Sequence, residues 1–142
     1  MRTTTLAAGV FSLSLAACSL TPERVQESEV NQDQKVAAQA LATRLYEACN
    51  SERFEALGDE AIPAMRDALS VEKQRTTCTQ IKGQFGEWNS MRYVETWRQD
   101  GLAIYRFKGR FAKGDEPEIR VVTDRSSKLA GFWLKPWSDA LR

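Results

Sequence analysis

Apolar residues recur at helical spacing in the first half of the chain. The longest such stripe consists of Ala37, Ala38, Leu41, Leu45 and Ala48. It predicts an amphipathic helix over residues 32–49. Asn31 is a suitable N-cap for this helix, with Gln34 three residues later as its capping-box partner.

Two further helices are expected before residue 90. Asp59 can cap the first of them, with Pro63 in its first turn, where a missing N–H costs little. The capping pattern formed by Thr77 and Gln80 predicts that the other helix opens near residue 77. A short helical turn is also expected over 52–57.

Apolar and polar residues alternate in the second half of the chain, which is typical of strands. Four strands are expected, over 91–98, 102–113, 118–124 and 128–134. Two tight-turn sequences, Gln99-Asp100-Gly101 and Gly114-Asp115-Glu116, separate the first three strands. Helices followed by such strands predict an α+β domain, with N-terminal helices packed on a curved four-stranded antiparallel sheet.

The length of the first turn decides which side chains share a face of the sheet. A three-residue loop places Glu95 opposite Tyr105 and Trp97 opposite Ala103. A two-residue turn instead places Thr96 opposite Tyr105. We favour the longer loop, because it gathers the large aromatic side chains on one face.

The last strand has two possible registers. A three-residue loop before it would turn Leu129 and Trp133 inward. A four-residue loop would instead turn inward Ala130, Phe132 and Leu134. The sequence does not decide between them.

Composition removes several classes of function. The 142 residues suit one domain, and 20 basic against 19 acidic residues give no overall field for nucleic acid, so no nucleic-acid partner is expected. The chain contains no histidine, which excludes a Ser-His-Asp triad and any His-containing zinc site. Three cysteines are too few for a four-cysteine zinc site, and we expect no metal or cofactor.

The amino-terminal residues have the layout of a secretion signal, with a basic start and a short apolar core. The sequence Leu15-Ala16-Ala17-Cys18 resembles the lipobox of bacterial lipoproteins. This resemblance implies that residues 1–17 are a signal peptide and that Cys18 is lipidated and attached to a membrane. Ser19 favours the periplasmic face of the outer membrane, by analogy with enteric lipoproteins. The alternative is an ordinary signal peptide with a chance cysteine.

Residues 18–30 are polar after the lipidated cysteine and are expected to form a tether, with a single domain over 31–142. The two remaining cysteines, Cys49 and Cys78, are expected to form a disulfide, as is usual in secreted proteins. The alternative is a pair of redox-active thiols, although their spacing is not Cys-x-x-Cys.

Residues 31–137 resemble small bacterial lipoproteins of the nuclear-transport-factor-like (cystatin-like) superfamily. The matching features are the Gly-containing segment 81–88 and the final strand Ala130-Gly131-Phe132-Trp133-Leu134-Lys135-Pro136. The final strand has one residue more before its proline than the family pattern. The resemblance implies a cone-shaped sheet with a pocket on its concave face, and no particular activity.

Glu95 is the residue that fits its predicted surroundings least well. It would lie between Tyr93 and Trp97, opposite Tyr105, where a carboxylate is difficult to ionise and could act as an acid or base. Alternatively, Glu95 pairs with an arginine such as Arg44, or faces solvent.

Aromatic side chains of the predicted sheet could line a ligand pocket or simply form the core. They are Trp88, Tyr93, Trp97, Tyr105 and Trp133. Basic residues dominate the opposite face, at Arg92, Arg98, Arg106, Lys108, Arg110 and Arg120. These residues could bind an anionic partner, but a solvated outer face is favoured.

These observations favour a non-catalytic, lipid-anchored binding or accessory module of the cell envelope. Its partners would be the membrane through Cys18 and either a small apolar ligand or an envelope protein. Two alternatives remain. One is an immunity or inhibitor protein for an envelope enzyme, and the other is a pocket enzyme that uses Glu95 and Tyr105.

Overall fold

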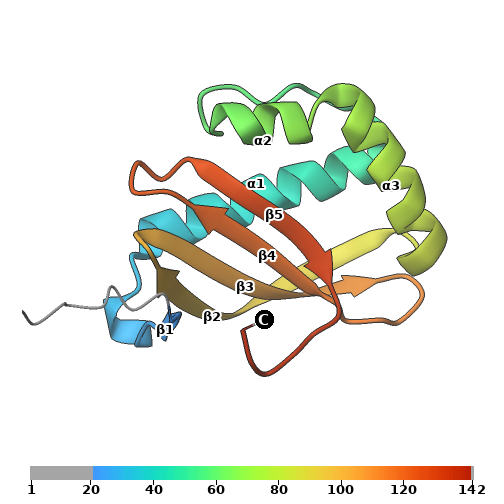
Figure 1. The fold of residues 1–142 in the computed structure, drawn as a ribbon. Coiled ribbons are helices and arrows are strands. Elements are labelled where there is room, and N and C mark those ends of the chain that lie inside the picture. Colours follow the sequence, from blue (N-terminus) through green and yellow to red (C-terminus); the bar gives the residue numbers. More distant parts are fainter. Residues whose placement is uncertain (1–20, 142) are drawn as a thin grey trace, which may run out of the picture.

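The computed structural model describes residues 21–141, which form helices and one open antiparallel sheet. The elements are β1 (Glu23–Arg24), a 3-10 turn (Glu27–Glu29), α1 (Gln32–Ser51), α2 (Pro63–Ala68), α3 (Val71–Phe85), β2 (Trp88–Gln99), β3 (Leu102–Phe111), β4 (Glu118–Thr123) and β5 (Leu129–Lys135). The strands are ordered β1-β2-β3-β4-β5. Figure 1 shows α1 running along one face of this sheet, here called the inner face, with α2 beyond β5 and α3 at the right-hand end of the strands. The predicted α+β class is confirmed, but the sheet has five strands and not four.

The additional strand comes from the segment that we predicted to be a tether. Glu23 and Arg24 pair with the end of β2, and the N–H of Val25 donates to the carbonyl of Thr96 at 2.9 Å. Val25 and Val30 are both buried in the core. The folded domain therefore begins ahead of the predicted position 31. Two valines in a polar segment are too few to produce a recognisable period.

The first helix follows its prediction closely. The side chain of Asn31 accepts a hydrogen bond from the N–H of Gln34 at 3.1 Å, as a helix N-cap does. The helix ends at Ser51, where Glu52 takes a left-handed conformation with φ 58°. The helical turn predicted over 52–57 is absent from the structure, which has turn and irregular backbone there.

The starts of the other two helices were predicted less well. Pro63 does occupy the first turn of α2, but no side chain caps this helix. The helix α3 begins at Val71, where Ser70 accepts from the N–H of Lys73 at 3.4 Å. The predicted start near residue 77 is wrong because the first two turns of α3 are almost wholly polar and give no apolar period.

The β2–β3 turn contains two residues, so the preferred three-residue loop is wrong. Asp100 and Gly101 both have positive φ, at 52° and 81°, which is the backbone of a type I′ hairpin turn. Thr96 therefore pairs with Tyr105, and Glu95 pairs with Arg106. This register turns Glu95 away from the helices.

A bulge in β2, just before Glu95, shifts the register back by one residue. The register changes between Tyr93 and Glu95, so Tyr93 pairs with Phe107, which is the register that a three-residue loop would give. The extra residue, Val94, lets Tyr93 remain on the inner face while Glu95 lies on the outer one. The first turn and this bulge together decide the faces of the whole hairpin.

The register of β5 matches the four-residue alternative at two positions. Phe132 pairs with Val121, and Leu134 pairs with Ile119, so both turn inward. A second bulge near residue 130 also brings Leu129 inward, where it is fully buried. Trp133 turns toward the outer face and is 50% exposed. The core between α1 and the inner face includes Ala38, Ala42, Leu45, Tyr46, Tyr105, Phe107, Phe111, Ile119, Val121 and Leu129.

Candidate functional site

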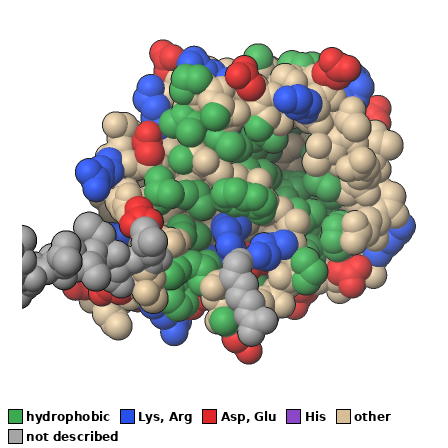
Figure 2. Space-filling view, in the orientation of Figure 1, with side chains coloured by type: hydrophobic (Ala, Val, Ile, Leu, Met, Phe, Trp, Pro, Cys, Tyr) green, Lys and Arg blue, Asp and Glu red, His purple; other side chains and the backbone are tan. Residues whose placement is uncertain are grey.

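An apolar groove lies between β5 and the helices, with a volume of about 420 Å³. Figure 2, in the orientation of Figure 1, shows hydrophobic side chains gathered over this part of the molecule around a hollow. The groove is lined by Leu45, Tyr46, Cys49, Met65, Ala68, Leu69, Gln74, Thr77, Cys78, Ile81, Phe132, Trp133 and Leu134. None of these side chains carries a charge, so the groove suits an uncharged, apolar ligand.

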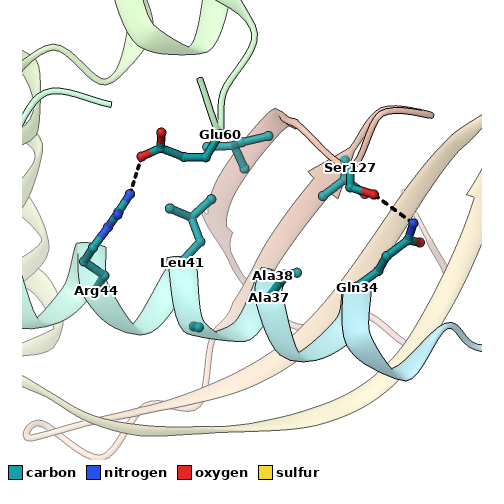
Figure 3. A pocket seen from close by; sticks show the side chains of 10 residues that line it. Gln34, Ala37, Ala38, Leu41, Arg44, Glu60 and Ser127 are labelled. Atoms are coloured by element: carbon teal, nitrogen blue, oxygen red, sulfur yellow. Dashed lines mark hydrogen bonds and ion pairs between the residues drawn. The ribbon is translucent and has the colours of Figure 1, made fainter. Parts of the chain in front are cut away.

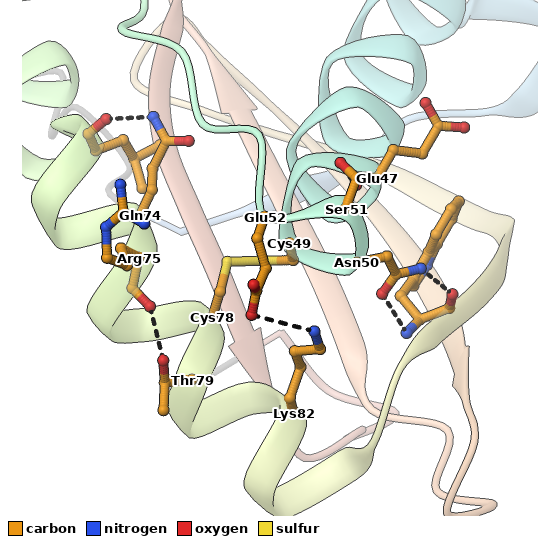
Figure 4. The surroundings of a disulfide bond; sticks show 12 residues. Glu47, Cys49, Asn50, Ser51, Glu52, Gln74, Arg75, Cys78, Thr79 and Lys82 are labelled. Carbon is orange, nitrogen blue, oxygen red and sulfur yellow. Dashed lines mark hydrogen bonds and ion pairs between the residues drawn. A yellow bond between two sulfur atoms is a disulfide. The ribbon is translucent and has the colours of Figure 1, made fainter.

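The disulfide fixes the helices that form the groove. Cys49, near the end of α1, is bonded to Cys78 in α3, with a Cα–Cα distance of 5.3 Å. Figure 4 shows this bond between the two helices, with Asn50 and Gln74 nearby. The side chain of Gln74 donates to the carbonyls of Glu55 and Leu69, at 2.8 and 2.7 Å. The structure thus joins the two cysteines that the sequence predicts to pair.

Aromatic side chains form one wall of the groove. Tyr46 is 1% exposed, and its ring contacts those of Trp88, Phe111 and Phe132 at centroid distances of 5.7–5.9 Å. Burial raises the pKa of the Tyr46 hydroxyl well above its ordinary value. Within residues 21–141, the hydroxyl of Tyr46 and the indole N–H of Trp88 are buried without a hydrogen-bond partner. An unpaired buried donor is costly, so such groups normally have a partner.

A second pocket lies between α1 and the β4–β5 turn, with a volume of about 560 Å³ (Figure 3). Alanines and Leu41 line its floor. At one end Arg44 binds Glu60, and at the other the amide of Gln34 donates to the hydroxyl of Ser127 at 2.8 Å. Its polar groups therefore already satisfy one another, which makes it the weaker candidate.

The outer face of the sheet contains a buried ionic cluster centred on Arg106, which is fully buried. Its guanidinium donates to both carboxylate oxygens of Glu118, at 3.0 and 2.9 Å, and also to Glu95. Arg24 contacts Glu95 at 3.0 Å, and Arg120 donates to Glu118 at 2.6 Å. We call these five residues the outer-face cluster.

The carboxy-terminal segment covers the outer-face cluster. The ring of Trp137 lies 4.3 Å from the guanidinium of Arg106, and the backbone carbonyl of Ser138 accepts a hydrogen bond from the same group. Burial alone would raise the pKa of Glu118, but hydrogen bonds from Arg106 and Arg120 outweigh it and hold the pKa below its ordinary value. Each of the two carboxylates in the cluster is thus bound by two arginines.

One protein-family model matches residues 42–132, which is well over half of the chain. It describes a protein of unknown function, DUF3887. The chain belongs to the DUF3887 family. No curated protein and no solved structure matches it.

The DUF3887 match contains most of the groove. Its residues include the second half of α1, both shorter helices and β5 as far as Phe132. The first strand and the carboxy-terminal segment that covers Arg106 lie outside the match. The match therefore covers most of the groove lining, but not Trp133, Leu134 or the segment that covers the outer-face cluster.

The predicted pairing of Glu95 with Tyr105 is wrong. Glu95 lies on the outer face and binds Arg24 and Arg106, whereas Tyr105 lies on the inner face and is 2% exposed. Burial raises the pKa of the Tyr105 hydroxyl. An arginine does bind Glu95, but Arg44, the suggested example, binds Glu60. The two candidate catalytic residues therefore cannot act on one substrate.

The predicted aromatic ligand set is also divided by the sheet. Tyr93 lies on the inner face and its hydroxyl bonds with that of Thr96 at 2.8 Å. Trp97 lies on the outer face, where its indole donates to Glu95 at 2.9 Å. Of Tyr93, Trp97, Tyr105 and Trp133, only Trp133 lines the apolar groove.

The outer face is not the solvated surface that we favoured. Arg106 is completely buried, and Arg120 is largely so, although Arg92, Arg98 and Arg110 are exposed. Alternation alone marked these positions as polar, and it could not show that the last residues of the chain return to cover them.

The groove residues missed by the sequence come from helices. Met65 in α2 and Leu69 directly after this helix are apolar and line the groove, as does Ile81 in α3. This pattern indicates a buried helix face, but it does not show that the face meets β5. Cys18 lies outside the described residues. Between residues 21 and 141, no helix is apolar and long enough to cross a bilayer, and no group of acidic, Cys or His side chains could hold a metal.

Proposed function

We propose that this protein is a non-catalytic binding module, anchored to the cell envelope through lipidated Cys18, that holds an apolar ligand in the groove beside β5. The observation that carries this proposal is a groove of about 420 Å³ lined without any charged side chain. A long helix, α1, that lies along the inner face of an antiparallel sheet supports a nuclear-transport-factor-like arrangement.

The chemistry of the lining supports binding over catalysis. The groove contains no carboxylate, lysine or arginine. Its one ionisable oxygen, the hydroxyl of Tyr46, has a raised pKa and stays protonated at neutral pH. It therefore cannot act there as a general base.

The anchor proposal rests on the lipobox sequence. The position of β1 limits how far the domain can lie from the anchor. Cys18 precedes Thr21 by three residues, and an extended chain of that length spans about 10 Å at most. Because β1 belongs to the sheet, the tether is much shorter than the predicted 18–30. We propose that the β1 end of the domain stays close to the outer membrane, on its periplasmic face.

The ligand site can be tested with two alanines of α2. Ala68 and Ala64 are both exposed, but only Ala68 lines the groove. Ala68→Trp should fill the groove and weaken binding of the uncharged fluorescent probe N-phenyl-1-naphthylamine at least tenfold. Ala64→Trp is the matched control and should leave binding unchanged. Equal binding by both variants would contradict the assignment.

The anchor is tested separately. Cys18→Ser should abolish labelling by a radioactive fatty acid and release the protein from the membrane fraction. Unchanged labelling and fractionation would contradict the anchor without affecting the groove.

A further inference from the structure

The groove lies beside an open edge of the sheet. The strand β5 is the last in the strand order, so β4 pairs with only one of its sides. On the other side, residues 60–62 pair with Leu129: the N–H of Leu129 donates to Glu60 at 2.7 Å, and the N–H of Ile62 donates to Leu129 at 3.0 Å. The chain thus already adds a short segment to this edge. Within residues 21–141, no strand pairs with this side of β5 from Ala130 to Leu134.

The composition of the groove lining shows that this edge forms part of its wall. Successive side chains of a strand point to opposite faces. Phe132, Trp133 and Leu134 are consecutive, yet all three line the groove. Side chains from one face alone could not produce this pattern, so the groove must extend around the edge of β5, where backbone N–H and C=O groups lie.

Both faces of the open edge are apolar. On the inner side, Met65, Leu69 and Ile81 line the groove. On the outer side the ring of Trp133 lies across Gly131, so closely that a Cβ there would be 2.1 Å from the ring. Natural proteins usually protect an open edge with lysine, proline or charge. Lys135 ends β5, but residues 129–134 contain none of these.

We infer that the ligand of the groove is an extended, uncharged stretch of polypeptide that pairs with residues 130–134 of β5 as a sixth strand. Its backbone would bond to the open edge, and its side chains would point alternately into the groove and against Trp133, as in β-strand addition. Five residues of strand span about 17 Å, which sets the length of the bound segment. This inference rests on the proposed function, because it uses the same groove.

Peptides of defined backbone chemistry test this inference. The probes are a panel of terminally blocked six-residue peptides built from Val, Leu, Phe and Thr, with Lys at each end for solubility. Binding is measured by the fluorescence of the full protein. Each peptide that binds is then made in two N-methylated copies, one methylated at odd positions and the other at even positions. Alternate N–H groups of a strand point to opposite edges. One copy should therefore lose binding at least tenfold while the other retains it.

Two protein variants complete the test. Trp133 and Val36 are the exposed large apolar residues within 21–141, at 50% and 62% exposure. Trp133→Lys places a charge at the open edge and should weaken peptide binding at least tenfold. Val36→Lys makes the same chemical change on α1, away from the groove, and should have no effect.

Three results would overturn the inference. Equal binding by both methylated copies would show that backbone pairing is not used. Binding of N-phenyl-1-naphthylamine without binding of any peptide would leave the proposed function standing and exclude a polypeptide ligand. A stable dimer that Trp133→Lys dissociates would show that a second copy of the chain occupies the edge.

Discussion

The outer-face cluster and the apolar groove lie on the same domain but differ in the charge of the side chains that form them. In the cluster, Arg106 bonds to two carboxylates and to a backbone carbonyl, beneath the ring of Trp137. In the groove, by contrast, no lining side chain carries a charge. Buried charges that bind one another have a structural role, whereas an unfilled apolar surface is suited to a ligand.

This difference matters because sequence alone directed attention to the wrong region. Glu95 beside aromatic residues suggested chemistry, yet its carboxylate is held by Arg24 and Arg106. Breaking such a pair leaves the other charge buried and alone, which is far more costly than losing an exposed pair. Changes in the cluster should therefore alter stability, and changes in the groove should alter binding.

Among changes in the cluster, Glu118→Gln should cause the largest loss of stability. It leaves the guanidinium of buried Arg106 without its bidentate partner and should lower the free energy of unfolding by about 3–5 kcal/mol. Urea denaturation measures this loss. Glu116→Gln is the matched control, because Glu116 makes only an exposed pair with Arg110 at 4.0 Å, worth less than about 1 kcal/mol. Equal losses in both variants would contradict the structural role of the cluster.

Removal of the disulfide should lower stability and weaken binding in the groove. Replacing Cys49 and Cys78 together with serine frees two positions separated by 29 residues and should cost about 3–4 kcal/mol of stability. Because this bond joins two helices that line the groove, binding of N-phenyl-1-naphthylamine should also weaken in the folded variant. Unchanged probe affinity would show that the helices hold the groove without the bond.

Acid should weaken the cluster before it affects the groove. The pKa of Glu118 in the folded protein lies below its ordinary value of 4.5, so its contribution to stability is present above that pH. The contribution is lost as the pH falls below 4.5 and through the folded-state pKa. The stability difference between the wild type and Glu118→Gln, followed by urea denaturation from pH 7 to 3, should therefore shrink in acid. A difference that stays constant would contradict this assignment.

Trp137→Ala should produce the smallest effect. It removes the ring that lies over Arg106 and Lys108, at 4.3 and 4.7 Å, while the ion pairs remain. A loss of about 1 kcal/mol is expected in urea denaturation, which is typical of a cation–π contact. A loss as large as that of Glu118→Gln would show that the carboxy-terminal cover, and not the ion pairs, dominates the cluster.

The sequence predicted elements with strong local signals and missed those decided by single residues. The cap of α1 at Asn31 and the strands between residues 91 and 134 follow from local pattern. The two-residue turn at Asp100 and the bulge at Val94 each shift the register by one residue, which is enough to move Glu95 to the other face.

The groove could not be predicted because it depends on contacts between distant segments. The apolar residues of α2 and α3 were visible as helix faces, but their position beside β5 is set by tertiary packing and by the bond between Cys49 and Cys78. Likewise, nothing in the local pattern around Arg106 indicates that Trp137 covers it.

The comparison is tested most directly by mapping amide NMR shifts during a titration with N-phenyl-1-naphthylamine. We predict that the perturbed amides cluster at groove residues such as Leu69, Ile81 and Phe132, while those of Arg106 and Glu118 remain unchanged. Shifts centred on the outer-face cluster, or saturation of the probe without shifts in the groove, would contradict the account.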